Sequence, residues 1–186
     1  NFINRIKELK PDIIVVVAFR ILPEIIFDIP SSGIFNLHAS LLPKYRGAAP
    51  INRAVMNGDT ETGVTTFFLK KKVDTGNIIL QDKINILPED DAGSLHDRLS
   101  KLGADAVMKT IELIEKNDLT LIKQDDSLAS KAPKIFKEDC LINWEDDSVK
   151  IHNHIRGLSP YPAAFTHYNN KSIKIFKSIL TGLSSE

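Results

Sequence analysis

The apolar run IIVVVAF at residues 13–19 constrains the fold more than any other feature of this sequence. It is too short to cross a membrane, which takes about 20 apolar residues in a helix. Its β-branched residues favour a strand, and an unbroken apolar strand is typical of a parallel sheet covered on both faces. We therefore expect a strand that is buried on both sides.

Strand and helix patterns alternate after this run. Apolar or alternating stretches predict strands at residues 33–38, 63–69 and 77–86, and helices are predicted at residues 49–59 and 94–116. The second helix starts at SLHD, which resembles a capping box. Apolar residues repeat along it at helical spacing, so one of its faces should pack on a sheet. They are Leu95, Leu99, Leu102, Ala106 and Leu113. Strands separated by helices predict an α/β sandwich.

The pattern changes after residue 116. Residues 117–136 are polar and weakly periodic, which predicts a linker. Residues 137–186 follow with a helix and two strand-like runs separated by Asn169 and Asn170. We therefore expect three parts: an α/β domain over 1–116, a linker over 117–136, and the start of a small β-rich domain over 137–186.

Composition excludes several classes of protein. The sequence has 24 basic and 24 acidic residues, which argues against a chain coated for nucleic acid but leaves room for a local basic face. One such face is predicted after the linker, where residues 148–185 contain five bases and no acid. Cys140 is the only cysteine, so neither an internal disulfide nor a cysteine-cluster metal site is expected, and a reducing compartment fits. The spacing of His96, His152, His154 and His167 suggests no metal site, and we interpret them as structural or surface residues.

Asn36 and His38 come at the end of the predicted strand 33–38. Open α/β sheets bind ligands at the carboxyl ends of their strands, and residues two apart on a strand share a face. An Asn amide can donate to a developing oxyanion, and a histidine can transfer protons. Asp74, in VDTG, could hold the histidine in one orientation. The alternatives stay open: a hydrogen-bonded structural histidine and an ordinary Asp-Thr-Gly turn.

The loop SLLPKYRGAAP joins this strand to the next helix. Ser40 and free backbone groups could bind a planar, amide-like ligand, and Lys44 and Arg46 could meet an anion. The alternative is a connecting loop with two solvated bases. AFRIL at residues 18–22 follows the first strand and could line the same pocket.

Together these segments resemble the methionyl-tRNA formyltransferase family. FNLHASLLPKYRGAAPINRAV resembles its signature, and GDTETGVT, VDTGNII, SKAPKIFKEDCLINW and IRGLSPYPAAF continue the pattern in order. The resemblance implies a Rossmann-like formyltransferase domain, a linker and an OB-like C-terminal β-barrel. It implies that Asn36, His38 and Asp74 form the catalytic set, with Asn36 and protonated His38 binding an oxyanion. It places the folate against Ser40, Leu41, Leu42 and Pro43. A second set of folate residues is implied by a more distant relative, glycinamide ribonucleotide formyltransferase, whose pterin-facing loop is similar to Phe19, Arg20, Ile21 and Leu22.

The family implies a cytoplasmic, monomeric enzyme without a metal. Its co-substrate is 10-formyltetrahydrofolate, which is released as tetrahydrofolate, and its acceptor is initiator methionyl-tRNA. Formyl transfer to a sugar amine or to glycinamide ribonucleotide, formyltetrahydrofolate hydrolysis, and a non-enzymatic folate- or RNA-binding module remain alternatives. By comparison with the family, the first elements of the catalytic domain and the end of the barrel lie outside this sequence, so we expect it to be inactive by itself.

Overall fold

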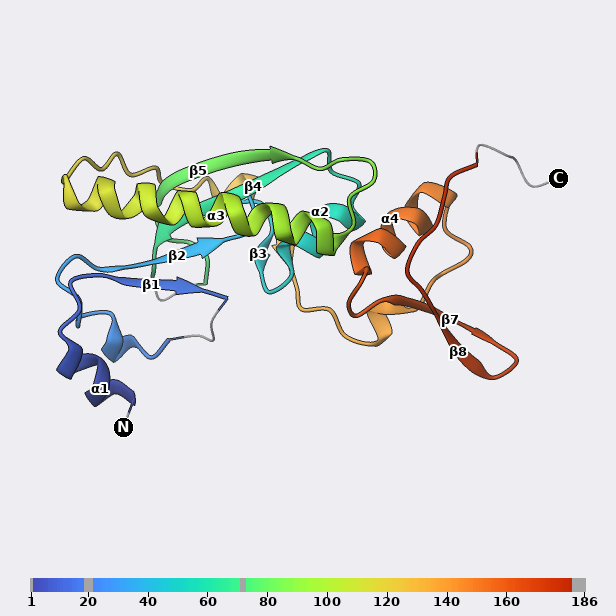
Figure 1. Ribbon diagram of the computed structural model, residues 1–186, viewed down its shortest axis with the longest axis horizontal. Helices are drawn as coiled ribbons and strands as arrows, with labels where there is room; N and C mark the ends of the chain where they lie inside the picture. Colours follow the sequence, from blue (N-terminus) through green and yellow to red (C-terminus); the bar gives the residue numbers. More distant parts are fainter. Residues whose placement is uncertain (1, 19–21, 71–72, 182–186) are drawn as a thin grey trace.

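The computed structural model describes residues 2–18, 22–70 and 73–181. Four of its strands form a central sheet in the order β1-β2-β4-β5 (Figure 1). Their bounds are Ile14–Val17 (β1), Ile34–His38 (β2), Glu61–Phe68 (β4) and Ile78–Asn85 (β5). β1 and β2 run parallel, whereas β2–β4 and β4–β5 are antiparallel. The predicted α/β class is confirmed, with a mixed sheet.

The expected burial of the first strand is wrong. β1 pairs only with β2 among the described residues and lies at the edge of their sheet, where Val17 is 55% exposed. The β-branched run does predict a strand, but burial depends on neighbours that local sequence does not specify.

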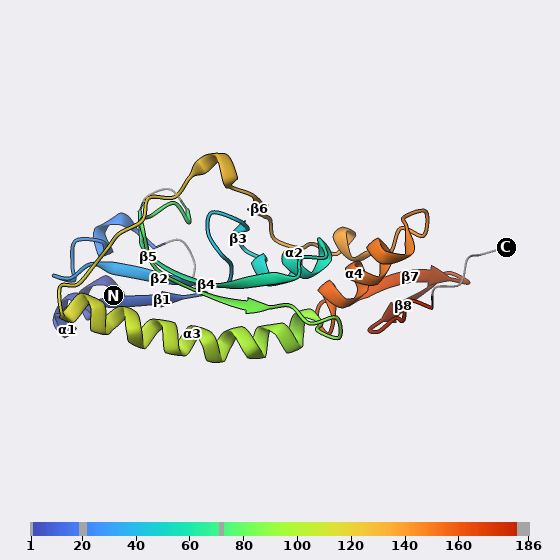
Figure 2. The ribbon, with the colours of Figure 1, turned by 90° about the horizontal axis from the view of Figure 1, so that it is seen from above.

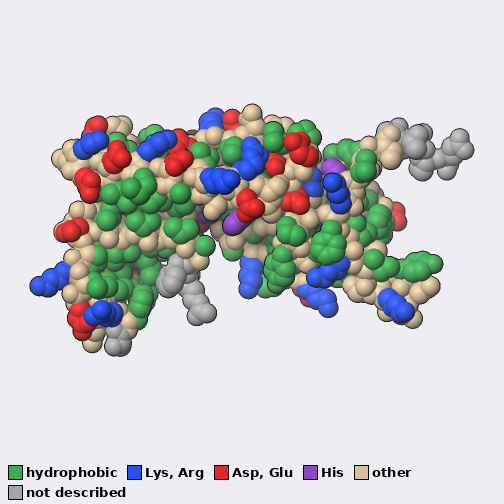
Figure 3. Space-filling model, in the orientation of Figure 1, with side chains coloured by type: hydrophobic (Ala, Val, Ile, Leu, Met, Phe, Trp, Pro, Cys, Tyr) green, Lys and Arg blue, Asp and Glu red, His purple; other side chains and the backbone are tan. Residues whose placement is uncertain are grey.

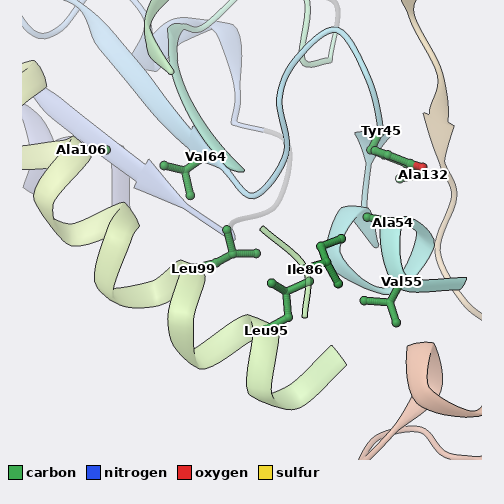
Figure 4. Packing of buried hydrophobic residues seen from close by; sticks show 9 residues of the cluster. All are labelled: Tyr45, Ala54, Val55, Val64, Ile86, Leu95, Leu99, Ala106 and Ala132. Atoms are coloured by element: carbon green, nitrogen blue, oxygen red, sulfur yellow. The ribbon is translucent and has the colours of Figure 1, made fainter. Parts of the chain in front are cut away.

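Helix α3 (Ala92–Glu115) covers one face of the sheet (Figure 2). Leu95 and Leu99 point from this helix toward the sheet and are buried (Figure 4). The helix begins two residues earlier than predicted because Asp91, not Ser94, is the N-cap. The Asp91 side chain accepts from the Ser94 amide while Ser94 Oγ accepts from the Asp91 amide, so the predicted capping box exists in a shifted register.

The remaining elements of the first 116 residues are short. They are α1 (Phe2–Leu9), the 3-10 turn η1 (Glu24–Ile26), β3 (Arg46–Gly47) and α2 (Pro50–Met56). Pro50 occupies the first helical position of α2, where its missing N–H costs nothing. In the described part of the chain, no helix has the length and apolar character to span a bilayer.

Residues 117–136 arch over the face of the sheet opposite α3 (Figure 2). They include η2 (Asp126–Leu128) and β6 (Lys131–Ala132), and β6 pairs in parallel with β3. Ile122 also exchanges two backbone hydrogen bonds with Ile78. The linker boundaries stay a prediction, but residues 122–132 of this segment are bound to the first unit.

The C-terminal unit contains η3 (Glu138–Cys140), α4 (Ser148–Leu158), β7 (Ala164–Tyr168) and β8 (Lys171–Ile175). β7 and β8 form an antiparallel hairpin whose turn residues, Asn169 and Asn170, both have positive φ. Asparagine tolerates this conformation, which suits a two-residue hairpin turn. The sequence predicts this second strand-like run over KSIKIFKSIL, residues 171–180, but β8 ends at Ile175 and is therefore shorter.

The two units meet where α4 packs on α2. Gly157 lies so close to α2 that a Cβ atom there would be 2.4 Å from Met56 Cγ and 2.9 Å from the Met56 nitrogen. Asn52 Nδ2 also donates to the Gly157 carbonyl at 2.8 Å. Arg156 donates to the main-chain oxygen of Asp90 at 3.0 Å, next to the start of α3. Glycine at position 157 thus permits a close helix–helix contact.

Candidate active site

Strand β2 positions the first two candidate residues. Asn36 pairs with Val16 on one side and Phe67 on the other, and His38 pairs with Thr65. Alternation along the strand places Asn36 and His38 on the same face. His38 is buried and Asn36 half-buried, at the carboxyl end of the strand.

The turn between β4 and β5 positions Asp74. This residue is buried and adopts φ +53°, a left-handed conformation that Asp tolerates better than most residues. Gly76 passes against the end of β4, where an added Cβ would lie 1.5 Å from the Phe68 carbonyl oxygen. The DTG sequence therefore reflects a real steric requirement, and the turn holds the Asp74 carboxylate inward.

His38 and Asp74 are brought together. Nδ1 of His38 lies 3.9 Å from Oδ2 of Asp74. The other ring nitrogen, Nε2, lies 2.8 Å from the carbonyl oxygen of Tyr45. Because a carbonyl can only accept, Nε2 carries a proton, and Nδ1 is the nitrogen left to gain or lose one. The backbone amide of Gly47 donates to the same Asp74 oxygen at 2.9 Å.

Thr65 anchors the SLLP segment at the end of β2. Its hydroxyl donates to the Ser40 carbonyl at 2.6 Å and accepts from the Leu42 amide at 3.1 Å. Gln81 Nε2 donates both to this hydroxyl and to the Leu42 carbonyl. Ser40 is fully buried, and its own hydroxyl donates to the Lys44 carbonyl. These bonds fix the loop independently of any ligand.

The predicted folate residues occupy different environments. Ser40 and Leu42 are buried, whereas Leu41 and Pro43 line a hollow of about 620 Å³ with Gln81. Neither His38 nor Asp74 lines this hollow. Leu22 is half-buried. The folate assignment stays a prediction; three of its residues lie outside those that the structure describes: Phe19, Arg20 and Ile21.

Of the two bases proposed to meet an anion, Lys44 is exposed and Arg46 is engaged inside the protein. Arg46 Nη2 lies 2.7 Å from the Asp126 carboxylate and 2.6 Å from Oε1 of Gln124. Arg46 therefore meets an anion of this chain itself, from the segment predicted to be a linker.

Tyr45 supports the site from behind. Its hydroxyl donates to Asp59 at 2.8 Å and accepts from Asn57 at 2.9 Å. Burial raises the pKa of Tyr45 to about 12; Asp59 contributes in the same direction and the Asn57 hydrogen bond opposes it. The ring is 6% exposed, so Tyr45 is a neutral, fixed part of the core at ordinary pH.

The sequence analysis did not identify two residues that help to build the candidate site. Tyr45 acts through its backbone carbonyl, which carries no residue-type signal. Gln124 stands in a polar stretch with no periodicity, yet it is 7% exposed and hydrogen-bonded on all sides. Only the tertiary contacts reveal either role.

The other four histidines lie in surface or structural surroundings, as interpreted from the sequence. His96 is exposed, His167 packs edge-on against Phe165, and His152 hydrogen-bonds Ser178. Burial lowers the pKa of His152 and of His154. Among the described residues, no group of three or more His, Cys, Asp or Glu side chains could hold a metal ion.

Comparison with known proteins identifies the family. Residues 1–111 match the family described as formyl transferase, and residues 134–186 match the formyl transferase C-terminal domain. The chain is 51% identical over 181 residues to a methionyl-tRNA formyltransferase of Chlorobium chlorochromatii, covering 97% of this chain and 58% of the relative. The chain thus spans somewhat more than half the length of such relatives.

Solved structures agree with this family. A sugar 3N-formyl transferase, solved with dTDP and 5-N-formyl-THF, is 30% identical with a TM-score of 0.77, over 95% of this chain and 65% of the other. HypX from Aquifex aeolicus, solved with tetrahydrofolic acid, has a TM-score of 0.79 at 20% identity, over 93% of this chain and 30% of HypX. The second likeness concerns the fold alone. With both domain families matched in order, and with half of the aligned residues identical to a curated relative, this chain belongs to the formyl transferase family.

Proposed function

We propose that the full-length protein transfers the formyl group of 10-formyltetrahydrofolate to the α-amine of initiator methionyl-tRNA. The observation that carries this proposal is the His38–Asp74 pair, with Nδ1 facing the carboxylate and Asn36 on the same strand face. The 51% identity to a methionyl-tRNA formyltransferase favours this acceptor over a sugar amine.

The chemistry follows from the free atoms of these side chains. The amine nitrogen attacks the formyl carbon, and the Asn36 amide hydrogen-bonds the oxyanion that forms. Nδ1 of His38 takes the proton lost by the amine, and the protonated ring then joins Asn36 in hydrogen-bonding the oxyanion. The facing Asp74 carboxylate stabilises this imidazolium. His38 then returns the proton to the folate nitrogen as its bond to the formyl carbon breaks. The new amide bond and the released tetrahydrofolate balance the reaction.

Two features of the C-terminal unit support tRNA as the partner. Lys171, Lys174 and Lys177 are exposed, and Lys and Arg side chains lie among exposed hydrophobic ones on this unit (Figure 3). Trp144 and Tyr168 are more than half exposed and could stack on unpaired bases. We further propose that the protein acts as a monomer in the cytoplasm.

The test is formyl transfer by full-length protein with methionyl-tRNA, unacylated tRNA and sugar amines as competing acceptors. Formylation of methionyl-tRNA alone is the expected result. Preference for a sugar amine would reassign the acceptor, and release of formate without an acceptor would indicate a hydrolase. Folate or RNA binding without turnover would leave the non-enzymatic alternative.

A further inference from the structure

Gln124 lies in the arch of residues 117–136 and uses every hydrogen-bonding position of its side-chain amide. Nε2 donates to the carbonyl oxygens of Asp74 at 3.0 Å and of Gly76 at 2.8 Å. Oε1 accepts from Nε of Arg46 at 3.0 Å and from Nη2 at 2.6 Å. A buried primary amide with two donors and two acceptor positions has no capacity left.

These bonds join two loops on which the candidate catalytic groups depend. One is the turn that carries Asp74. The other contains Tyr45, whose carbonyl holds His38, and Gly47, whose amide holds the Asp74 carboxylate. The arch also binds the second loop directly, because Ser130 Oγ accepts from the Tyr45 amide at 2.8 Å.

Gln124 and Gly47 hold different parts of the Asp74 turn. Gly47 reaches the carboxylate, but Gln124 contacts the main chain on both sides of Thr75. A shift of this turn would move the carboxylate from its position 3.9 Å from His38. We infer that Gln124 is a positioning residue for the formyl-transfer reaction, which fixes the Asp74 turn against the loop of residues 45–47. This inference rests on the proposed function.

Two substitutions separate this role from a simple tie between the arch and the loop. Gln124→Glu keeps an oxygen that accepts from Arg46 but loses both donors to the Asp74 turn. Gln124→Met has a side chain of similar size but loses all four hydrogen bonds. We expect kcat to fall about tenfold to a hundredfold in both variants, the scale for reacting groups misplaced by about 1 Å. The KM for 10-formyltetrahydrofolate should stay within about twofold, because Thr65 and Gln81 hold the SLLP segment separately.

Thr110→Val is the matched control for loss of a buried hydrogen bond. The Thr110 hydroxyl bonds Thr66 and the Ala106 carbonyl, and α3, which carries it, covers the face of the sheet opposite the arch that contains Gln124 (Figure 2). The Thr110→Val substitution should lower the free energy of unfolding and leave kcat unchanged. Wild-type kcat in Gln124→Glu with a loss in Gln124→Met would show that only the Arg46 tie matters, and would overturn the inference. Wild-type kcat in both would overturn it as well.

Hydrogen exchange at the Gly47 amide gives a readout that does not need turnover. Since this amide donates to Asp74, we expect its exchange to accelerate about tenfold or more in both Gln124 variants, and not in Thr110→Val. If full-length wild-type protein transfers no formyl group, the proposed function fails, and exchange still decides the positioning. Unchanged exchange in Gln124→Met would overturn the inference whatever the activity.

Discussion

Nε2 of His38 donates to the main-chain oxygen of Tyr45 at 2.8 Å. This bond fixes which ring nitrogen carries the permanent proton, and turns Nδ1 toward Asp74. Two residues beyond Tyr45, the Gly47 amide binds the Asp74 carboxylate. One short loop thus orients both partners of the pair through backbone atoms.

His38→Ala and Asp74→Asn should each remove most turnover without unfolding the protein. Proton transfer by a positioned side chain contributes about 10²–10⁴-fold to rate, and we expect kcat losses in that range. Asparagine still offers an oxygen to the Gly47 amide, so the turn should persist. Steady-state kinetics and thermal unfolding of full-length protein check this. Near-normal kcat in either variant would refute the proton-transfer roles.

Asn36→Ala should lower kcat by about 10²–10³-fold, the cost of one lost oxyanion donor. No hydrogen bond joins its side chain to another described residue, so the substitution should change stability little. Asn85→Ala, at the exposed end of β5, is the matched control and should have normal kinetics. Equal kinetics in the two variants would remove Asn36 from the mechanism.

Alkaline pH should destabilise the protein through Tyr45. Its folded pKa of about 12 exceeds the unfolded value near 10, so between these values the unfolded state has lost a proton that the folded state keeps. The stabilisation is complete below pH 10 and declines, by at most about 1.4 kcal/mol per pH unit, as pH rises toward 12. Urea unfolding at pH 9 and 11 should show a smaller decline in Tyr45→Phe. Identical declines would mean that Tyr45 does not hold its proton more tightly when folded.

Gly157→Ala should destabilise the contact between the two units. The new Cβ would clash with Met56 and approach the Asn52 carbonyl oxygen within 3.1 Å. Overpacking of this kind costs about 1–3 kcal/mol. Val149→Ala changes an exposed position of α4 and serves as the control. It should lower the free energy of unfolding, measured by chemical denaturation, by a smaller amount. A free energy of unfolding equal to wild type in Gly157→Ala would show that α4 can shift without loss.

Replacing Lys171 and Lys177 by Gln should weaken tRNA binding. Each lost phosphate contact should reduce the log–log salt slope by roughly one unit. Lys174 is left in place because its ammonium donates to the Pro162 carbonyl at 3.2 Å. Lys101 on α3 and Lys116 at its C-cap, replaced by Gln in the same way, serve as the control pair. If neither the affinity for tRNA nor its salt slope changes in the Lys171 and Lys177 variant, these lysines face solvent and do not contact tRNA. Formyl transfer at saturating tRNA should change little.

Alternation along KSIKIFK predicts that Lys171 and Lys177 face one side of a strand and Lys174 the other, and this prediction holds only in part. Lys171 and Lys174 lie within β8 and face opposite sides, because they are three residues apart. Lys177 lies beyond the end of β8, so parity does not place it with Lys171. Affinity and its salt dependence, rather than strand geometry, must therefore test the pair.

Local sequence determined the elements and the candidate residues of this protein. Apolar periodicity predicted β2, β4, β5 and α3, because side-chain pattern and backbone period are physically linked. The order Asn36, His38 and then DTG pointed to one sheet edge, since strand ends and tight turns have strong local signals. These are properties of short stretches, and a sequence shows them directly.

The tertiary structure decided which residues are in contact with one another. The burial of β1 depends on neighbouring strands, and the use of Arg46 as an internal cation depends on Asp126 and Gln124, some 80 positions away. The orientation of His38 depends on a backbone carbonyl, which is the same group in every residue. Long-range hydrogen bonds between polar segments leave no periodic trace, and so only the folded chain revealed that residues 117–136 brace the site.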